Sequence, residues 1–171
     1  MSVVILSLGT NVGDRAKFMT DIESALQKLS KTPLIKSPLY ETEALGVKGQ
    51  QENYYNRVVR MQTDLEPMDL LQKTQEIEQE LGRLSKNDLA PRTADIDILL
   101  FENIVVDLPN LKIPHPRIFL RKFVIEGIKV IAGEFVLPKI ADDFVKKGAK
   151  TFADYEPNEE VLSQNMKVLE A

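Results

Sequence analysis

The sequence predicts an α+β fold in which an antiparallel sheet of the ferredoxin-like, split βαβ type is covered by helices. Short apolar runs bounded by turn residues predict the strands, and segments with apolar residues at helical spacing predict the helices. Their order of strand, helix, strand, strand, helix, strand is the ferredoxin-like order. The chain has 171 residues, so we expect one domain over 1–171, with a short strand and a C-terminal helix appended.

The first half of the pattern lies within residues 3–52. The apolar run 3–8 predicts a buried strand, and a helix follows that is capped near Asp14. Pro33 ends this helix, because proline cannot continue the hydrogen-bonding ladder. Residues 34–42 predict a second strand, and 43–52 a long glycine-containing loop of the kind that often carries function.

The second half predicts two more strands around a second helix. Residues 54–63 have strand character, and Glu66-Pro67 opens a helix that Gly82 terminates. The apolar, β-branched segment 92–101 predicts the last strand of the sheet.

The appended part is less regular. We expect a short strand at 104–106, an interruption at Pro114-His115-Pro116, and then a helix that carries Val124, Ile125, Ile128 and Ile131. The tail 154–171 is acidic and poor in large apolar residues, so it predicts a loosely docked helix or a frayed terminus.

Composition excludes several kinds of protein. A net charge of −4 and a pI near 5.2 argue against a general nucleic-acid binder. The chain has no cysteine and one histidine, which removes disulfides, thiol nucleophiles and multi-histidine metal centres. No basic leader or membrane-length apolar run is present, so we expect a cytoplasmic protein with no membrane or nucleic-acid partner.

The segment that ends in Asp95-Ile96-Asp97 predicts a metal site on a strand. Strand side chains alternate, so Asp95 and Asp97 share one face, and Ala94, Ile96, Ile98 and Leu100 are expected on the other. Two carboxylates on one face repel each other unless a cation lies between them, and Mg²⁺ is commonly held by one or two carboxylates plus substrate phosphates. The alternative is a strand with a solvated acidic face.

Basic residues bracket this strand. Arg83, Lys86 and Arg92 precede it, and arginine offers fork-like donors that match phosphate oxygens. For Arg83 alone, a helix C-terminal cation is the simpler interpretation. His115 lies near Arg117, Arg121 and Lys122, which suits a triphosphate tail or, equally, a solvated basic loop.

Aromatic residues and an amide suggest a site for a flat heterocycle. Tyr54 and Asn56 share one face of the strand 54–63, and Phe123 lies in the later helix. From residue type alone, aromatic side chains packed in the core are the better interpretation.

Taken together, these motifs resemble those of the 6-hydroxymethyl-7,8-dihydropterin pyrophosphokinase (HPPK) family. The matching segments, between Val3 and about Gly133, are Leu8-Gly9-Thr10-Asn11-Val12-Gly13-Asp14, Tyr40-Glu41-Thr42, Leu45-Gly46, Tyr54-Tyr55-Asn56, Glu78 with Gly82-Arg83, Pro91-Arg92-Thr93-Ala94-Asp95-Ile96-Asp97 and Pro114-His115-Pro116. The resemblance implies an enzyme, 2-amino-4-hydroxy-6-hydroxymethyldihydropteridine diphosphokinase. Such an enzyme transfers pyrophosphate from ATP to the pterin hydroxymethyl group in folate biosynthesis and releases AMP.

The same resemblance implies roles for individual residues. Asp95 and Asp97 would hold two Mg²⁺ ions, with Arg83, Arg92 and Asp97 forming the catalytic set. The pterin would be bound by Thr42, Leu45, Tyr54, Asn56 and Phe123. ATP would be bound by Leu71, Gln75, Glu78, Lys86, Arg92, Ile98, His115 and Arg121. The implied partners are the two small-molecule substrates, and we expect a monomer, with weak dimerisation as the alternative.

One departure from the family pattern keeps other functions open. The connection from Leu84 to Ala90 has Lys86 as its only cation, so a pterin- or nucleotide-binding module with weakened turnover is the alternative. A nucleotidyltransferase with the same aspartate pair would transfer AMP instead of releasing it. An RNA-binding ferredoxin-like protein is disfavoured by the acidic composition.

Overall fold

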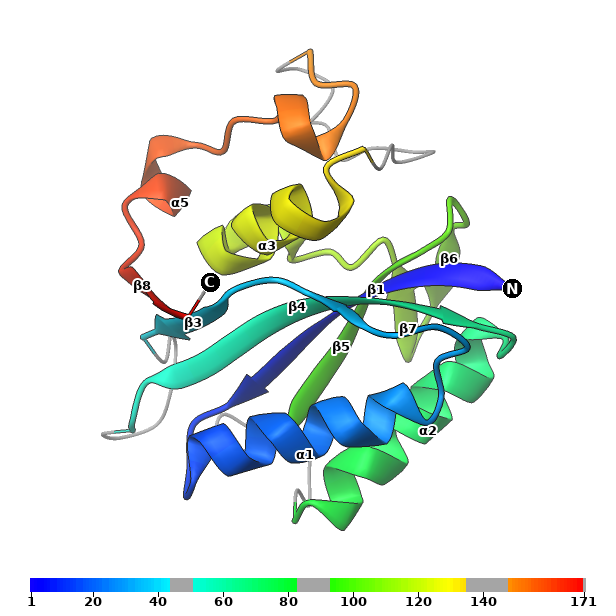
Figure 1. Ribbon diagram of the computed structural model, residues 1–171. Helices are drawn as coiled ribbons and strands as arrows, with labels where there is room; N and C mark the ends of the chain where they lie inside the picture. Colours follow the sequence, from blue (N-terminus) through cyan, green and yellow to red (C-terminus); the bar gives the residue numbers. More distant parts are fainter. Residues whose placement is uncertain (44–50, 83–92, 135–147, 171) are drawn as a thin grey trace.

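The computed structural model describes residues 1–43, 51–82, 93–134 and 148–170, and arranges them in three layers (Figure 1). The middle layer is an antiparallel sheet with the strand order β5-β1-β4-β3-β8, in which β2 also pairs with β4. The strands are β1 (Ser2–Thr10), β2 (Ile35–Lys36), β3 (Leu39–Thr42), β4 (Tyr54–Thr63), β5 (Asp95–Phe101) and β8 (Met166–Glu170).

Helices α1 (Arg15–Gln27) and α2 (Pro67–Glu80) cover one face of this sheet (Figure 1). As predicted, Asp14 caps α1, since its carboxylate accepts a 3.1 Å hydrogen bond from the Lys17 backbone N–H. Gly82 follows α2 with a φ of 98°, the left-handed conformation that ends many helices. The order β5-β1-β4-β3 with two helices on one face confirms the predicted ferredoxin-like class.

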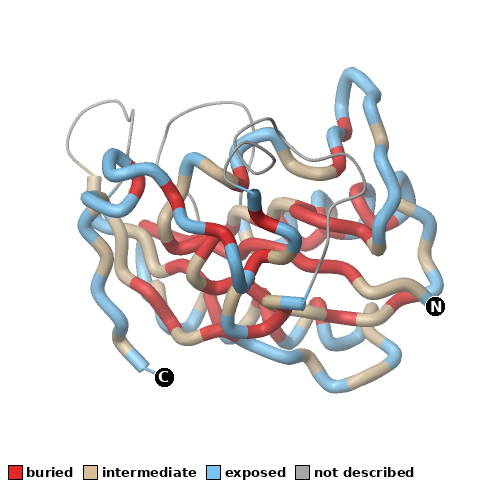
Figure 2. Tube along the Cα trace, turned by 90° about the horizontal axis from the view of Figure 1, so that it is seen from above, coloured by how far each residue is buried: buried red, intermediate tan, exposed pale blue. Residues whose placement is uncertain are grey.

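Helix α3 (Lys122–Ala132) packs on the opposite face, so the sheet has two separate cores. Figure 2 shows the buried segments running through the centre of the molecule, where the sheet lies between its helices. Helix α3 approaches β4 closely at Gly127, where a Cβ would lie 2.5 Å from a methyl group of Val58. Only glycine allows the helix this close to the strand.

Between β5 and α3 the chain forms a hairpin and a short 3-10 turn. The hairpin strands are β6 (Val106–Leu108) and β7 (Leu111–Ile113), and the turn η1 spans Ile118–Leu120. The predicted appended strand therefore exists, but it begins at Val106, where the prediction had it end. Residues 34–42 also differ from the prediction, because they form two strands separated by Ser37-Pro38, where proline removes a backbone N–H from the ladder.

A bulge in β5 reverses one predicted orientation. Leu6 pairs with Ile98 and Ile5 with Leu100, so Leu99 is an extra residue in the strand. Ala94, Ile96 and Ile98 pack towards α1 and α2 as expected, but Leu100 packs in the α3 core instead. The prediction for Leu100 was wrong because strict alternation stops at the bulge.

The tail is neither a loose helix nor a frayed end over the residues described. Phe152 and Tyr155 are fully buried, η2 (Phe152–Asp154) and α5 (Glu159–Leu162) follow one another, and β8 pairs with β3. The chain therefore closes the sheet with an edge strand (Figure 1). None of the helices within the described ranges is long and apolar enough to cross a membrane.

Candidate active site

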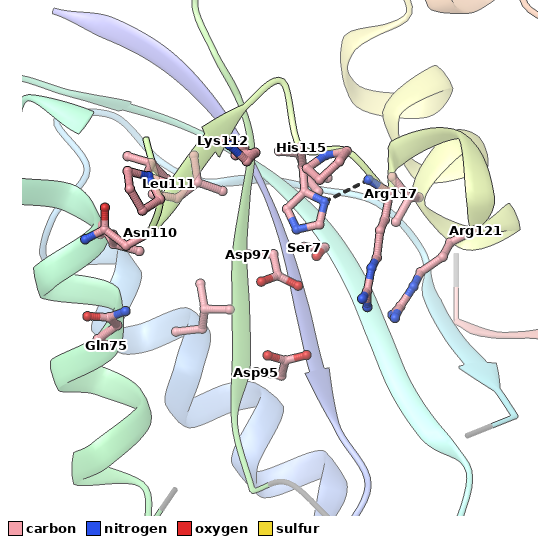
Figure 3. Close-up of a pocket in the computed structure, with 17 residues that line it drawn as sticks. Ser7, Gln75, Asp95, Asp97, Asn110, Leu111, Lys112, His115, Arg117 and Arg121 are labelled. Atoms are coloured by element: carbon pink, nitrogen blue, oxygen red, sulfur yellow. Dashed lines mark hydrogen bonds between the residues drawn. The ribbon is translucent and has the colours of Figure 1, made fainter. Parts of the chain in front are cut away.

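A cavity of about 670 Å³ lies along β5, which forms one edge of the sheet (Figure 3). Its walls come from β1, α2, β5, the β6–β7 hairpin, the loop after β7 and the start of α3. The lining residues are Ser7, Leu71, Gln75, Asp95, Ile96, Asp97, Ile98, Leu99, Pro109, Asn110, Leu111, Lys112, His115, Pro116, Arg117, Arg121 and Val124. A volume of this size accommodates a small-molecule ligand.

Asp95 and Asp97 project from the same face of β5 into this cavity, as the alternation of the strand predicts (Figure 3). On the neighbouring strand β1, Gly9 pairs with Asp95 and Ser7 pairs with Asp97. Both aspartates are half-buried, so their carboxylates remain accessible from the cavity. The neighbours on β1 are small, which leaves room in front of the pair.

This pair of carboxylates suits a hard cation that is coordinated partly by the protein and partly by the oxygens of a substrate. Within the described ranges, no cluster of three histidine or acidic side chains is positioned to hold a metal. Two carboxylate donors leave most of an octahedral coordination shell to water and phosphate oxygens, which is how Mg²⁺ is commonly bound at nucleotide sites. The pair therefore fits Mg²⁺ better than a metal that needs a complete protein cage.

Cationic side chains line the same cavity. Lys112, Arg117 and Arg121 contribute to its wall. The Lys112 ammonium group pairs with Asp107 of the hairpin, whereas the two arginine side chains lie to one side of the aspartates (Figure 3). Arginine presents planar, fork-like donors that bind phosphate oxygens in pairs. Carboxylates and cations facing one cavity are the arrangement expected for a polyphosphate bound with a divalent cation.

His115 is oriented by its own loop. Its backbone N–H donates to the carbonyl of the bulged residue Leu99 at 2.9 Å, and its Nδ1 accepts from the Arg117 backbone N–H at 3.1 Å. Because Nδ1 is an acceptor, the ring proton is on Nε2, and the neutral imidazole can donate one hydrogen bond into the cavity.

Neutral residues line the α2 side of the cavity. Leu71 and Gln75 come from α2, Ile98 from β5, and Asn110 from the β6–β7 hairpin turn. In Figure 3, Gln75 and Asn110 lie on one side of Asp97, and Arg117 and Arg121 on the other. The cavity is therefore polarised, with a neutral end and a cationic end on opposite sides of the aspartates.

Glu78 lies beneath the site instead of in its lining. Its side chain is only 3% exposed, and Oε2 accepts a 2.9 Å hydrogen bond from the backbone N–H of Ile96. Glu78 is absent from the cavity wall and supports the backbone of β5 through this bond, and its contact with ATP stays a prediction. A buried carboxylate of this kind fixes the backbone to which both aspartates are attached.

A second group of predicted residues lies beside the cavity on the same sheet face. Asp95 pairs with Gly9, and Gly9 pairs with Asn56, so Asn56 is two strands from Asp95, about 10 Å away. Asn56 Nδ2 donates to Thr42 Oγ1 at 2.5 Å. A Cβ at position 9 would lie 2.9 Å from Asn56 Oδ1 and 3.4 Å from the Tyr54 ring. Gly9, Thr42, Tyr54 and Asn56 thus form one contiguous group.

Phe123 is only 6% exposed and belongs to the core beneath α3, so its pairing with Tyr54 around a pterin stays a prediction. Leu45, Arg83, Lys86 and Arg92 lie outside the described residues.

Several cavity residues were not among those predicted for the site, namely Ser7, Asn110 and Lys112. Ser7 had a usable signal, because it is a polar residue within the apolar run of β1. The positions of Lys112 and Asn110 depend on the hairpin folding back over β5, which no local pattern reveals.

The fold and the site define an α+β protein whose sheet edge carries paired carboxylates facing cations, a combination suited to binding phosphate groups with a metal ion. The particular family follows from comparison. The model of the family described as 7,8-dihydro-6-hydroxymethylpterin-pyrophosphokinase (HPPK) matches residues 5–133, and the chain belongs to this family.

Individual relatives agree with this assignment. The chain is 38% identical over 131 residues to the 2-amino-4-hydroxy-6-hydroxymethyldihydropteridine pyrophosphokinase of Bacillus subtilis, covering 76% of this chain and 78% of the relative. It is 34% identical over 156 residues to the protein of the same name from Haemophilus influenzae, covering 91% and 96%.

A structural neighbour supports the fold. The HPPK-DHPS of Plasmodium falciparum, solved with pteroate, has a TM-score of 0.64 at 16% identity over 89% of this chain. The chain spans 41% of that protein's length, and at this identity the likeness shows the fold alone.

Proposed function

We propose that this protein is a pyrophosphokinase that transfers the pyrophosphoryl group of ATP to 6-hydroxymethyl-7,8-dihydropterin and releases AMP in folate biosynthesis. The main support for this proposal is the position of the two aspartates. Asp95 and Asp97 face the cations of a single cavity, and they lie on the sheet face that also carries Asn56. We propose that residues 1–171 act as one catalytic domain in the cytoplasm, where ATP is available.

The polarity of the cavity orients ATP. Leu71, Gln75 and Ile98 offer neutral surface for the base and sugar, and Arg121 and His115 offer donors for the phosphates. Asp95 and Asp97 lie between these two ends (Figure 3). In this orientation the phosphate chain passes in front of the aspartate pair.

Asp95 and Asp97 are the residues that would hold Mg²⁺, for which we propose two ions. When bound, Mg²⁺ supplies positive charge that neutralises phosphate oxygens and holds them in line. The protein contributes the position of the two carboxylates, which β1 and Glu78 fix through the backbone of β5.

The pterin is proposed to bind at the group formed by Gly9, Thr42, Tyr54 and Asn56. The Tyr54 ring offers a flat surface for stacking, and the hydrogen-bonded Asn56 and Thr42 offer polar atoms for the edge of the heterocycle. Strand spacing places this group about 10 Å from Asp95. A hydroxymethyl group that points from a pterin bound here towards the cavity reaches the phosphate region.

The reaction is an in-line displacement at the β-phosphorus. The pterin hydroxymethyl oxygen forms a bond to this phosphorus, and the bond from the phosphorus to the oxygen that bridges the α- and β-phosphates breaks. AMP leaves with the bridging oxygen, and the hydroxyl proton passes to solvent, with Asp97 able to assist. A strong base is not required, because phosphoryl transfer depends mainly on positioning and charge neutralisation.

The test is AMP release from Mg-ATP with and without 6-hydroxymethyl-7,8-dihydropterin. Wild type should release AMP only with the pterin, and Asp97→Ala should lower kcat about 100-fold or more, as the loss of a metal carboxylate predicts. Asp64→Ala is the matched control, since Asp64 is an exposed carboxylate that pairs with Met1 and Lys31 outside the cavity. Pterin binding with no AMP would favour the weakened binding module instead.

A further inference from the structure

The side-chain amide of Gln164, near the C-terminus, binds the backbone on both sides of Arg121. Gln164 Nε2 donates to the Leu120 carbonyl at 2.8 Å, and its Oε1 accepts from the Lys122 N–H at 3.0 Å. Arg121 precedes the first residue of α3, and its guanidinium has no acceptor with which to cap the helix. Gln164 supplies the acceptor that the helix start needs.

The residues that follow Gln164 bind β3 and the residue after it, beside the group that contains Thr42 and Tyr54. Asn165 Nδ2 donates to Glu43 Oε1 at 2.7 Å, and Met166 pairs with Thr42 in the sheet. Thr42 pairs with Tyr54 on its other side. Residues 164–166, here called the clamp, therefore contact the backbone on both sides of Arg121 and also pair with β3 beside Tyr54.

The clamp is anchored on both sides along the chain. Before it, Val161 of α5 is buried in the α3 core. After it, Glu170 accepts a 2.6 Å hydrogen bond from Arg57. Arg57 is a buried residue, and its guanidinium also bonds Glu23 and the Ser37 carbonyl. Because both flanking segments are fixed, Gln164 is held in register with the start of α3.

We propose that Gln164 is a positioning residue for the transfer reaction. By binding the two peptide groups that flank Arg121, it fixes the backbone from which the guanidinium extends into the cavity. Gln164 is not part of the cavity wall, so it acts through Arg121 and not on the substrate. The inference rests on the proposed function, in which Arg121 binds the phosphates of ATP.

Gln164→Ala should raise the KM for Mg-ATP about three- to tenfold, the effect of losing one or two hydrogen bonds that orient a ligand group. The KM for the pterin should stay within about twofold. Gln164→Glu keeps the acceptor for the Lys122 N–H, and should therefore retain more ATP affinity than the alanine variant. Ser163→Ala is the matched control, because the Ser163 hydroxyl donates to the Glu160 carbonyl of its own turn.

A double-mutant cycle separates positioning from general stabilisation. In an Arg121→Ala background, Gln164→Ala should leave the KM for Mg-ATP unchanged. An equal increase with and without Arg121, or a loss of thermal stability with KM values like those of wild type, would overturn the inference.

The dissociation constant of a non-hydrolysable Mg-ATP analogue provides a readout independent of turnover. The Gln164 variants should show the same dependence on Arg121 in this binding assay. Failure of wild type to release AMP would count against the proposed function, whereas an analogue affinity insensitive to Gln164 would count against the clamp.

Discussion

Glu78 Oε2 accepts a 2.9 Å hydrogen bond from the backbone N–H of Ile96, the residue between the two cavity aspartates. The bond joins α2 to β5 across the core, and Glu78 is buried there. The carboxylate pair is therefore positioned from behind by a third carboxylate that does not face the cavity.

Removing Glu78 should affect stability as well as activity. Glu78→Ala leaves the buried Ile96 N–H without this acceptor, at an expected cost of about 1–3 kcal/mol in the free energy of unfolding. Glu78→Gln keeps an acceptor and should lose less. Urea unfolding and steady-state kinetics measure both effects, with Glu76→Ala on the exposed side of α2 as the control. Equal stability of the Glu78→Ala and Glu76→Ala variants would contradict this role.

Alanine at position 127 should destabilise the protein, although alanine is normally the better helix residue. Helix propensity favours alanine over glycine by about 1 kcal/mol. The new Cβ would lie 2.5 Å and 2.8 Å from side-chain atoms of Val58, and overpacking of this kind costs about 1–3 kcal/mol or more. Denaturant unfolding should show a net loss in Gly127→Ala. Adding Val58→Ala should cost less in this background than in wild type, and a stabilised Gly127→Ala protein would refute the close contact.

The stability of the protein should depend on Tyr40 at alkaline pH. Burial, together with the nearby Glu126 carboxylate, raises the pKa of Tyr40 above its ordinary value of 10.0. Above pH 10 the unfolded chain loses this proton while the folded protein keeps it, so the free energy of unfolding falls as the pH rises. Tyr40→Phe should show a smaller fall between about pH 9 and 11 in denaturant unfolding. Identical slopes for the two proteins would show that Tyr40 ionises freely in the fold.

Replacing Gly9 by alanine should weaken binding of the pterin and leave binding of Mg-ATP almost unchanged. The Cβ of Gly9→Ala would lie 2.9 Å from Asn56 Oδ1, so the amide that bonds Thr42 must move. We expect the KM for the pterin to rise about tenfold and that for Mg-ATP to change little, since a misplaced hydrogen-bonding group costs about 1–2 kcal/mol. Steady-state kinetics with each substrate varied in turn measures this difference. A change confined to the KM for Mg-ATP would place the pterin elsewhere.

Strand β1 was predictable because its apolar run ends at turn residues, and β4 because aromatic and β-branched residues recur along it. The shared face of Asp95 and Asp97 was also predictable, because side chains two residues apart in a strand point to the same side. The reversed orientation of Leu100 was not predictable, because the bulge that causes it appears only when β5 pairs with β1.

The C-terminal strand was missed for a different physical reason. An edge strand such as β8 is held by its backbone pairing with β3. Four residues of β8 pair in this way, and two of them, Lys167 and Glu170, are polar. Such a strand needs no alternating apolar pattern. The buried role of Glu78 was likewise invisible, since a carboxylate on a helix is usually solvated.

Transfer of the intact pyrophosphoryl group from ATP to the pterin distinguishes a pyrophosphokinase from a nucleotidyltransferase. The most direct measurement follows the fate of ATP labelled at the γ-phosphate, with products separated and identified by mass. Intact transfer predicts a labelled pterin that carries two phosphates, together with unlabelled AMP. A pterin that carries AMP, with the label in released pyrophosphate, would show a nucleotidyltransferase and contradict it.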